Sequence, residues 1–139
     1  GRKIKNGEDI AILSLGHVGN YAVDACKQLN TKGIDAAHYD MRFAKPLDSL
    51  LLHEVFGKFS HIITVEDGCV VGGIGTAIAE FMLDNGYSSS IKRLGIPDSY
   101  IEHGTQEELH AECEYDANAI SRVAQEIIKK STSKSSQTA

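Results

Sequence analysis

Short apolar runs alternate with longer segments whose apolar residues recur at helical spacing, and this alternation constrains the fold most strongly. Runs typical of strands occur at Ile10–Leu15, 36–41, 62–65 and 91–96. The first of them is almost continuously apolar, which is typical of a strand covered on both faces. Strands that alternate with helices form a parallel sheet between helical layers. The sequence therefore predicts an α/β fold of three layers, with a mostly parallel sheet of about five strands and helices on both faces.

Local signals mark where the predicted helices begin and end. Side chains that commonly cap a helix N-terminus stand before three of them: Asn20, Asp48 and Asp116. Gly33 and Gly86 follow the last apolar residues of two helices, where glycine commonly ends a helix. Residues 105–108, Thr-Gln-Glu-Glu, form a capping box, so a short helix is expected to begin there.

The N-terminal residues have the pattern of a β-hairpin. Asn6 and Gly7 separate the strand-like residues 3–5 from the run that ends at Leu15. Asn-Gly is favoured in type I′ turns because both residues tolerate positive φ. We therefore expect the first strand to be an antiparallel edge strand, formed by this hairpin.

The length of the chain and its C-terminal composition predict one domain and a tail. A chain of 139 residues is normally a single domain. Residues 131–139 are small and polar, cannot bury apolar surface, and are expected to be disordered. The predicted domain therefore covers residues 1–130. Because the sequence begins with Gly1 and not with Met, we expect it to be a piece of a longer polypeptide.

Composition argues against several classes of partner. The net charge of −5 gives no basic surface for nucleic acid. No apolar run approaches the roughly 20 residues that span a bilayer. The three cysteines, Cys26, Cys69 and Cys113, are far apart, which favours free thiols in a reducing cytoplasm.

A glycine-rich turn connects the strand at 62–65 to the next helix, as in phosphate-binding loops. The lysine of a P-loop is missing, because Ile74 and Gly75 follow Gly73. Ile78 stands where a dinucleotide-binding turn has its third glycine. We therefore expect no nucleotide here, and interpret the glycines as residues that let the helix pack close to the sheet.

Polar residues gather at the predicted carboxyl ends of the strands, where ligands bind in such sheets. They are His17, Asp40, Arg42, Glu66, Asp67 and Asp98, and Gly16 and Pro97 lie beside them at the same strand ends. One interpretation is a small-molecule or catalytic site, and the other is a docking surface or a set of internal ion pairs. In particular, Arg42 and Glu66 are predicted to form a bidentate ion pair between two loops.

Other catalytic and metal-binding patterns are missing from the sequence. The six histidines lack ligand spacing such as H-E-x-x-H, and His38 is expected to be packed within a strand. Ser14 precedes Gly16 without completing the G-x-S-x-G pattern of α/β-hydrolases. The sequence therefore predicts no catalytic, cofactor-binding or metal-binding residue.

Three segments carry a resemblance to a known family. They read D-M-R-F-A-K-P-L-D at 40–48, V-E-D-G and G-G-I-G within 65–75, and G-I-P-D…H-G-T-Q-E-E-L within 95–109. Together they resemble the C-terminal domain of thiamine-diphosphate enzymes of the transketolase group, over residues 1–130. The first and last segments are most similar to the 1-deoxy-D-xylulose-5-phosphate synthases.

The resemblance implies a large, homodimeric parent enzyme in the cytoplasm. Such an enzyme condenses pyruvate with glyceraldehyde 3-phosphate, with thiamine diphosphate held through Mg²⁺, and its product feeds isoprenoid and thiamine biosynthesis. In this family the cofactor lies between the two domains that precede this one, so the chain alone is expected to be inactive. The implied role is structural, namely to cover the neighbouring domain and strengthen the dimer. The candidate structural or domain-interface residues are Arg42, Glu66, Gly72, Gly73 and Gly75.

Two alternatives stay open at this point. The chain could be an independent flavodoxin-like module that binds a ligand or a regulator in a pocket at Gly16, Arg42 and Glu66. It could also be the equivalent domain of a transketolase or of a dehydrogenase β subunit.

Overall fold

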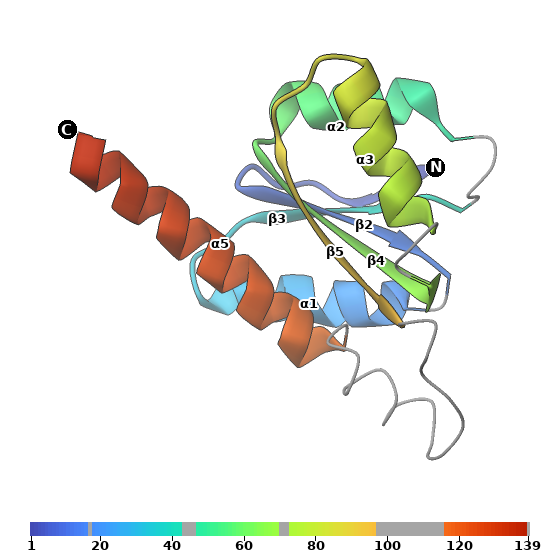
Figure 1. The fold of residues 1–139 in the computed structure, drawn as a ribbon. Coiled ribbons are helices and arrows are strands. Elements are labelled where there is room, and N and C mark those ends of the chain that lie inside the picture. The colour runs from blue at the N-terminus through green and yellow to red at the C-terminus, as the bar shows by residue number, and fades with distance from the viewer. Residues whose placement is uncertain (17, 43–46, 70–72, 97–115, 139) are drawn as a thin grey trace.

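The computed structural model describes residues 1–16, 18–42, 47–69, 73–96 and 116–138, and in these residues five strands form one sheet (Figure 1). The strands are β1 (Arg2–Lys5), β2 (Ile10–Leu15), β3 (Ala36–Asp40), β4 (His61–Cys69) and β5 (Ser90–Ile96). Their spatial order is β1-β3-β2-β4-β5. The β1–β3 pair is antiparallel and the other three pairs are parallel. The predicted α/β fold with one antiparallel edge strand is confirmed.

Helices cover both faces of this sheet. They are α1 (Gly19–Thr31), α2 (Ser49–Lys58), α3 (Ile74–Asp84) and α5 (Ala117–Thr138). Figure 1 shows α1 and α5 on one face and α2 and α3 on the other. Alternate residues of β2 enter opposite cores: Ile10 and Ile12 pack under α1 and α5, whereas Leu13 packs under α2 and α3. This two-sided burial is the physical reason for the continuous apolar run in β2.

The predicted helix ends are largely confirmed. Asp48 Oδ1 accepts a hydrogen bond from Leu51 N at 3.1 Å, and Asp116 Oδ1 accepts one from Ala119 N at 2.8 Å. Gly33 and Gly86 have φ of 78° and 74°, which lets the chain turn out of α1 and α3. The predicted cap Asn20 is wrong, since it lies inside α1, whose N-cap is Val18. The capping box at 105–108 lies outside the described residues.

The predicted N-terminal hairpin is wrong. Strand β1 is the expected antiparallel edge, but it pairs with β3, with Arg2 opposite Asp40. Neither Asn6 nor Gly7 has the positive φ of a type I′ turn. Because β2 is buried on both faces, it takes a central position between β3 and β4, which leaves the polar β1 at the outer edge.

The C-terminal helix is longer than expected. It continues to Thr138, whereas composition predicts a disordered tail over residues 131–139. The segment contains no proline or glycine, and an existing helix gains one hydrogen bond for each residue it adds. Its last turns extend away from the sheet in Figure 1.

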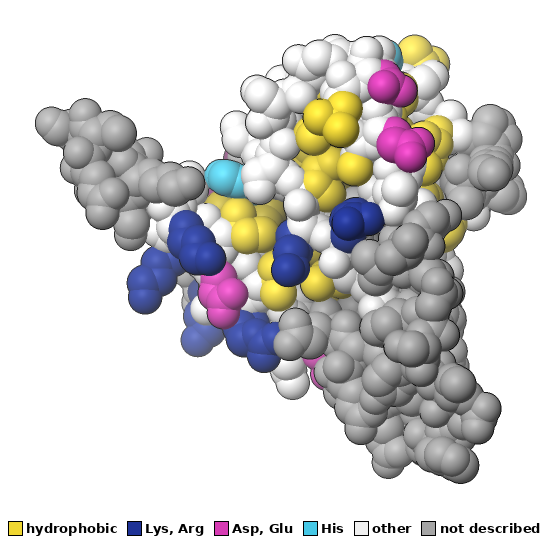
Figure 2. Space-filling view, viewed as in Figure 1, with side chains coloured by type: hydrophobic (Ala, Val, Ile, Leu, Met, Phe, Trp, Pro, Cys, Tyr) yellow, Lys and Arg dark blue, Asp and Glu magenta, His cyan; other side chains and the backbone are white. Residues whose placement is uncertain are grey.

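Part of the surface is apolar. Leu50 on α2 is 83% exposed and Leu83 on α3 is 69% exposed. Figure 2 shows hydrophobic side chains open over α3, while Lys and Arg side chains gather toward α5. None of the helices in the described ranges has the length and hydropathy needed to cross a membrane.

Gly75 lies where the first turn of α3 approaches the sheet. A Cβ atom at this position would be 2.7 Å from Thr64 Oγ1 and 3.1 Å from Arg93 Cγ. Real Cβ contacts are essentially never as short as 2.7 Å, so a larger residue would force Thr64 or the first turn of α3 to shift. Gly75 therefore sets the distance between α3 and the sheet.

We predict that Gly75→Ala lowers the free energy of unfolding by about 1–3 kcal/mol, because the added methyl group overpacks this contact. Gly57→Ala is the matched control, since a Cβ atom at Gly57 in α2 meets nothing within 4 Å. This control should raise the free energy of unfolding by up to about 1 kcal/mol, because alanine favours helix. Urea denaturation measures both values, and equal effects would contradict the packing role of Gly75.

Candidate functional site

The sheet register brings several of the predicted strand-end residues together. Ser14 lies opposite Asp40 in the β2–β3 pair, and Leu15 lies opposite Glu66 in the β2–β4 pair. Arg42 follows β3 by two residues. His17, Pro97 and Asp98 lie outside the described residues, and only the backbone of Asp67 is described.

Glu66 is the buried acid of this edge, with a residue exposure of 5%. Its Oε2 accepts a hydrogen bond from Ile74 N at 2.7 Å, and its Oε1 accepts one from Gly75 N at 3.4 Å. These two N–H groups belong to the first turn of α3, whose N-cap, Gly73, offers no side-chain acceptor. In nucleotide-binding folds the same helix end binds a phosphate. Here a carboxylate of the chain itself occupies that end.

The environment of Glu66 acts on its ionisation in two directions. Burial raises the pKa of Glu66, and the hydrogen bonds from Ile74 and Gly75 and the charge of Arg93 oppose that rise. Since the net pKa shift is upward, the carboxyl group of Glu66 binds its proton more tightly in the folded state than in the unfolded state. The contribution of Glu66 to stability is therefore largest below the ordinary glutamate pKa and declines as the pH rises through the folded value.

The predicted ion pair between Arg42 and Glu66 is not formed in the described part of the chain. Arg42 is exposed and has a φ of 64°, and its backbone N–H donates to Asp40 Oδ1 at 2.9 Å. Glu66 is buried and already bonded to α3. The local turn after β3 therefore determines the position of Arg42.

A buried hydrogen bond between Ser14 and His38 was not predicted. Ser14 Oγ lies 2.8 Å from His38 Nε2, and both residues are almost fully buried. His38 is packed within a strand, as expected, and burial lowers its pKa to about 4, against the opposing charge of Asp40. The ring is therefore neutral near pH 7, and its Nδ1 has no hydrogen-bond partner among the described residues. The only sequence signal was a serine and a histidine within two otherwise apolar strands.

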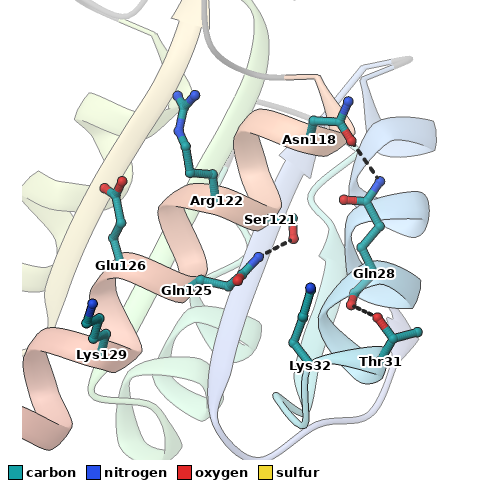
Figure 3. A pocket seen from close by; sticks show the side chains of 9 residues that line it. All are labelled: Gln28, Thr31, Lys32, Asn118, Ser121, Arg122, Gln125, Glu126 and Lys129. Atoms are coloured by element: carbon teal, nitrogen blue, oxygen red, sulfur yellow. Dashed lines mark hydrogen bonds between the residues drawn. The ribbon is translucent and has the colours of Figure 1, made fainter.

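A polar hollow of about 380 Å³ lies between α1 and α5 (Figure 3). Gln28 of α1 donates a hydrogen bond to Asn118 of α5 at 3.1 Å, and Gln125 donates to Ser121 at 3.1 Å. Its charged side chains are Lys32, Arg122, Glu126 and Lys129. The Gln28–Asn118 hydrogen bond links α1 to α5, whereas the Gln125–Ser121 bond lies within α5.

The remaining reactive groups favour a structural interpretation. Burial raises the pKa of the Cys26 thiol to about 11, so the thiol stays protonated near neutral pH and is a poor nucleophile. Over the described ranges, no three His, Cys, Asp or Glu side chains are grouped so that they could hold a metal ion.

Comparison with known protein families shows which family the chain belongs to. The family model described as "Transketolase, C-terminal domain" matches residues 1–120. The chain belongs to the transketolase C-terminal domain family. The resemblance predicted from the sequence segments is therefore confirmed.

Other members of this family are closely similar in sequence. The 1-deoxy-D-xylulose-5-phosphate synthase of Cytophaga hutchinsonii is 53% identical over 127 residues, which are 91% of this chain and 20% of that protein. The synthase of Bacteroides fragilis is 50% identical over 124 residues, 88% of this chain and 19% of that protein. The chain thus spans about a fifth of the length of these relatives.

Solved structures share the fold of this transketolase C-terminal domain. The inactive β4 tetramer of a split-gene transketolase matches with a TM-score of 0.83 at 30% identity, over 91% of this chain and 41% of that one. A transketolase from Pichia stipitis matches with a TM-score of 0.63 at 20% identity, over 91% of this chain and 18% of that one. The second similarity shows the fold alone.

We predict that Glu66→Ala lowers the free energy of unfolding by about 1–3 kcal/mol, because two buried N–H groups of α3 lose their acceptor. Glu80→Ala is the matched control, since Glu80 is exposed on the same helix and its truncation should change stability by less than about 0.5 kcal/mol. Chemical denaturation near pH 7 compares the two variants. Equal losses would mean that Glu66 does not hold α3.

We also predict that His38 makes the domain sensitive to acid. Its folded pKa of about 4 lies below the ordinary value of 6.5, so the unfolded state binds more protons between these values. Stability should therefore fall as the pH decreases from about 6.5 toward 4, by up to about 3 kcal/mol from this group. Denaturation curves at several pH values should show a smaller fall for His38→Gln. Parallel pH profiles for the two proteins would contradict this assignment.

Proposed function

We propose that this chain is the C-terminal domain of a 1-deoxy-D-xylulose-5-phosphate synthase and that its role is structural. The observation that carries the proposal is the 53% identity to one such synthase over 91% of the chain. The synthases match at 40–53% identity, whereas the transketolase structures match at 20–30%. This difference favours a synthase over a transketolase as the parent enzyme.

Under this proposal, the whole protein condenses pyruvate with glyceraldehyde 3-phosphate and supplies isoprenoid and thiamine biosynthesis. It is a cytoplasmic homodimer that uses thiamine diphosphate and Mg²⁺. Both cofactors belong to the domains that precede this one, and the domain itself covers residues 1–130.

The geometry of the strand-end edge supports a structural role. Glu66 occupies the helix end that would otherwise attract a phosphate or diphosphate. We propose that Arg42, Glu66, Gly73 and Gly75 shape a surface that meets a neighbouring domain; the fifth predicted residue, Gly72, lies outside the described residues.

The apolar surface supports the same role. A neighbouring domain or the second subunit would bury exposed side chains such as Leu50 and Leu83. Both side chains belong to helices on the same face of the sheet, so one partner could cover that face.

We predict that the isolated chain shows no heat of thiamine-diphosphate binding with Mg²⁺ present and no release of CO₂ from pyruvate. The full-length synthase of Cytophaga hutchinsonii, in the same calorimeter and the same assay, is the positive control. Millimolar or tighter cofactor affinity of the isolated chain would contradict the structural role.

A further inference from the structure

The two edge strands of the sheet differ in how they are protected from pairing with another chain. Strand β1 has four residues, and its pairing with β3 shifts register between Lys3 and Lys5. The Nζ atom of Lys3 also lies 3.2 Å from Glu54 Oε1, so an acid of the chain itself neutralises this cation. A short, irregular edge strand is a poor template for a further strand. Strand β5, at the opposite edge, runs in continuous register with β4 from Ser90 to Leu94.

The outer side of β5 is open in the part of the chain that the structure describes. No described strand pairs with it on that side, and Ser90, Lys92 and Arg93 are exposed. An edge strand turns a row of backbone N–H and C=O groups away from its sheet. These unpaired groups can bind an extended peptide as an additional strand.

The side of β5 that faces α5 is positively charged. Lys92 lies two residues before Leu94, which packs in the core under α1 and α5, so Lys92 points to that side. It forms no ion pair with any described residue. The exposed charged residues in the described part of α5 are Arg122, Glu126, Lys129 and Lys130. Figure 2 shows Lys and Arg side chains gathered over β5 and α5, although the chain as a whole has a net charge of −5. This surface therefore attracts an acidic partner.

The side of β5 that faces α3 offers an aliphatic contact. Ile91 is half-buried and packs against the core under α2 and α3. Arg93, the next residue on this side, is directed to α3, where its Nη1 donates to Thr76 Oγ1 at 2.8 Å. An additional strand would meet a cation that is not paired in the described residues on one side of the sheet and an aliphatic side chain on the other. A segment that alternates acidic with apolar residues matches both sides, because successive side chains of a strand point to opposite faces.

The same charges disfavour a second copy of this chain as the added strand. Pairing of β5 with β5 would bring Lys92 and Arg93 beside the same cations of the other copy, and like charges on neighbouring strands destabilise the pair. A lysine in an edge strand commonly protects it in this way. An acid on the neighbouring strand reverses the effect, because opposite charges across a strand pair attract.

We propose that the outer edge of β5 binds an acidic segment of a partner protein as an additional strand. The segment is extended, alternates acidic with apolar residues, and turns its acids toward Lys92 and α5. Backbone hydrogen bonds to β5 supply the affinity, and the side chains supply the selectivity. This inference does not rest on the proposed function of the whole protein.

Fluorescence anisotropy with the 139-residue chain tests this proposal with three labelled peptides. The first is an octapeptide of alternating glutamate and valine, which should bind saturably at submillimolar concentrations. The second has lysine in place of each glutamate and should bind at least about tenfold more weakly, because its charges are repelled. The third keeps the first sequence but is N-methylated along its central residues. It has lost backbone N–H donors and should also bind at least about tenfold more weakly.

Charge-matched variants and NMR locate the binding surface. Lys92→Glu should weaken binding of the glutamate–valine peptide by about five- to tenfold, because an attraction becomes a repulsion. Lys32→Glu makes the same change of charge at the α1–α5 hollow and should change this affinity by less than about twofold, because salt screens distant charges. In the unaltered chain, the peptide should shift the backbone amide resonances of Ser90–Arg93 saturably.

Several outcomes would overturn the proposal. They are no saturable binding of the glutamate–valine peptide, equal weakening by Lys92→Glu and Lys32→Glu, and amide shifts confined to residues outside β5. Equal affinity of the N-methylated peptide would also overturn it, because that result would indicate attraction of any polyanion to the basic surface. Circular dichroism of each variant verifies that it is folded before its affinity is interpreted.

Discussion

The hydrogen bonds from the first turn of α3 to the Glu66 carboxylate are the interaction on which the rest of the structure depends. They join the end of β4 to the helix that covers one face of the sheet. These hydrogen bonds oppose the cost of burying the acid without cancelling it, since burial still raises the pKa of Glu66. Gly75 favours this geometry, because a Cβ atom at this position would lie only 2.7 Å from Thr64 Oγ1.

The same interaction explains how a fold that resembles nucleotide-binding folds can serve a structural role. A parallel sheet with a glycine turn before a helix normally presents free N–H groups to an anion. In this member of the transketolase C-terminal domain family, the anion is a side chain. The helix end that would bind an anion in such folds is therefore filled by the chain itself.

The sequence predicted the layers, most helix ends and the edge position of β1, because these follow from local periodicity and capping. It did not predict that β1 pairs with β3, since the Asn6-Gly7 signal is local and the burial of β2 on both faces prevails over it. The partners of Glu66 were also missed. The sequence suggested Arg42 as the partner of Glu66, because it was the nearest opposite charge. The actual partners of the Glu66 carboxylate are backbone N–H groups of α3, which no side-chain pattern reveals. The Ser14–His38 contact likewise depends on strand register.

The central claim is that Glu66 fills the anion site of α3, and the backbone amide resonances of Ile74 and Gly75 report on it most directly. We would titrate the isolated chain and its Glu66→Ala variant with pyrophosphate and follow these two resonances by NMR. The account predicts that they do not move in the unaltered chain and that they move saturably in the variant, where the helix end is open. Saturable shifts of Ile74 and Gly75 in the unaltered chain would contradict it.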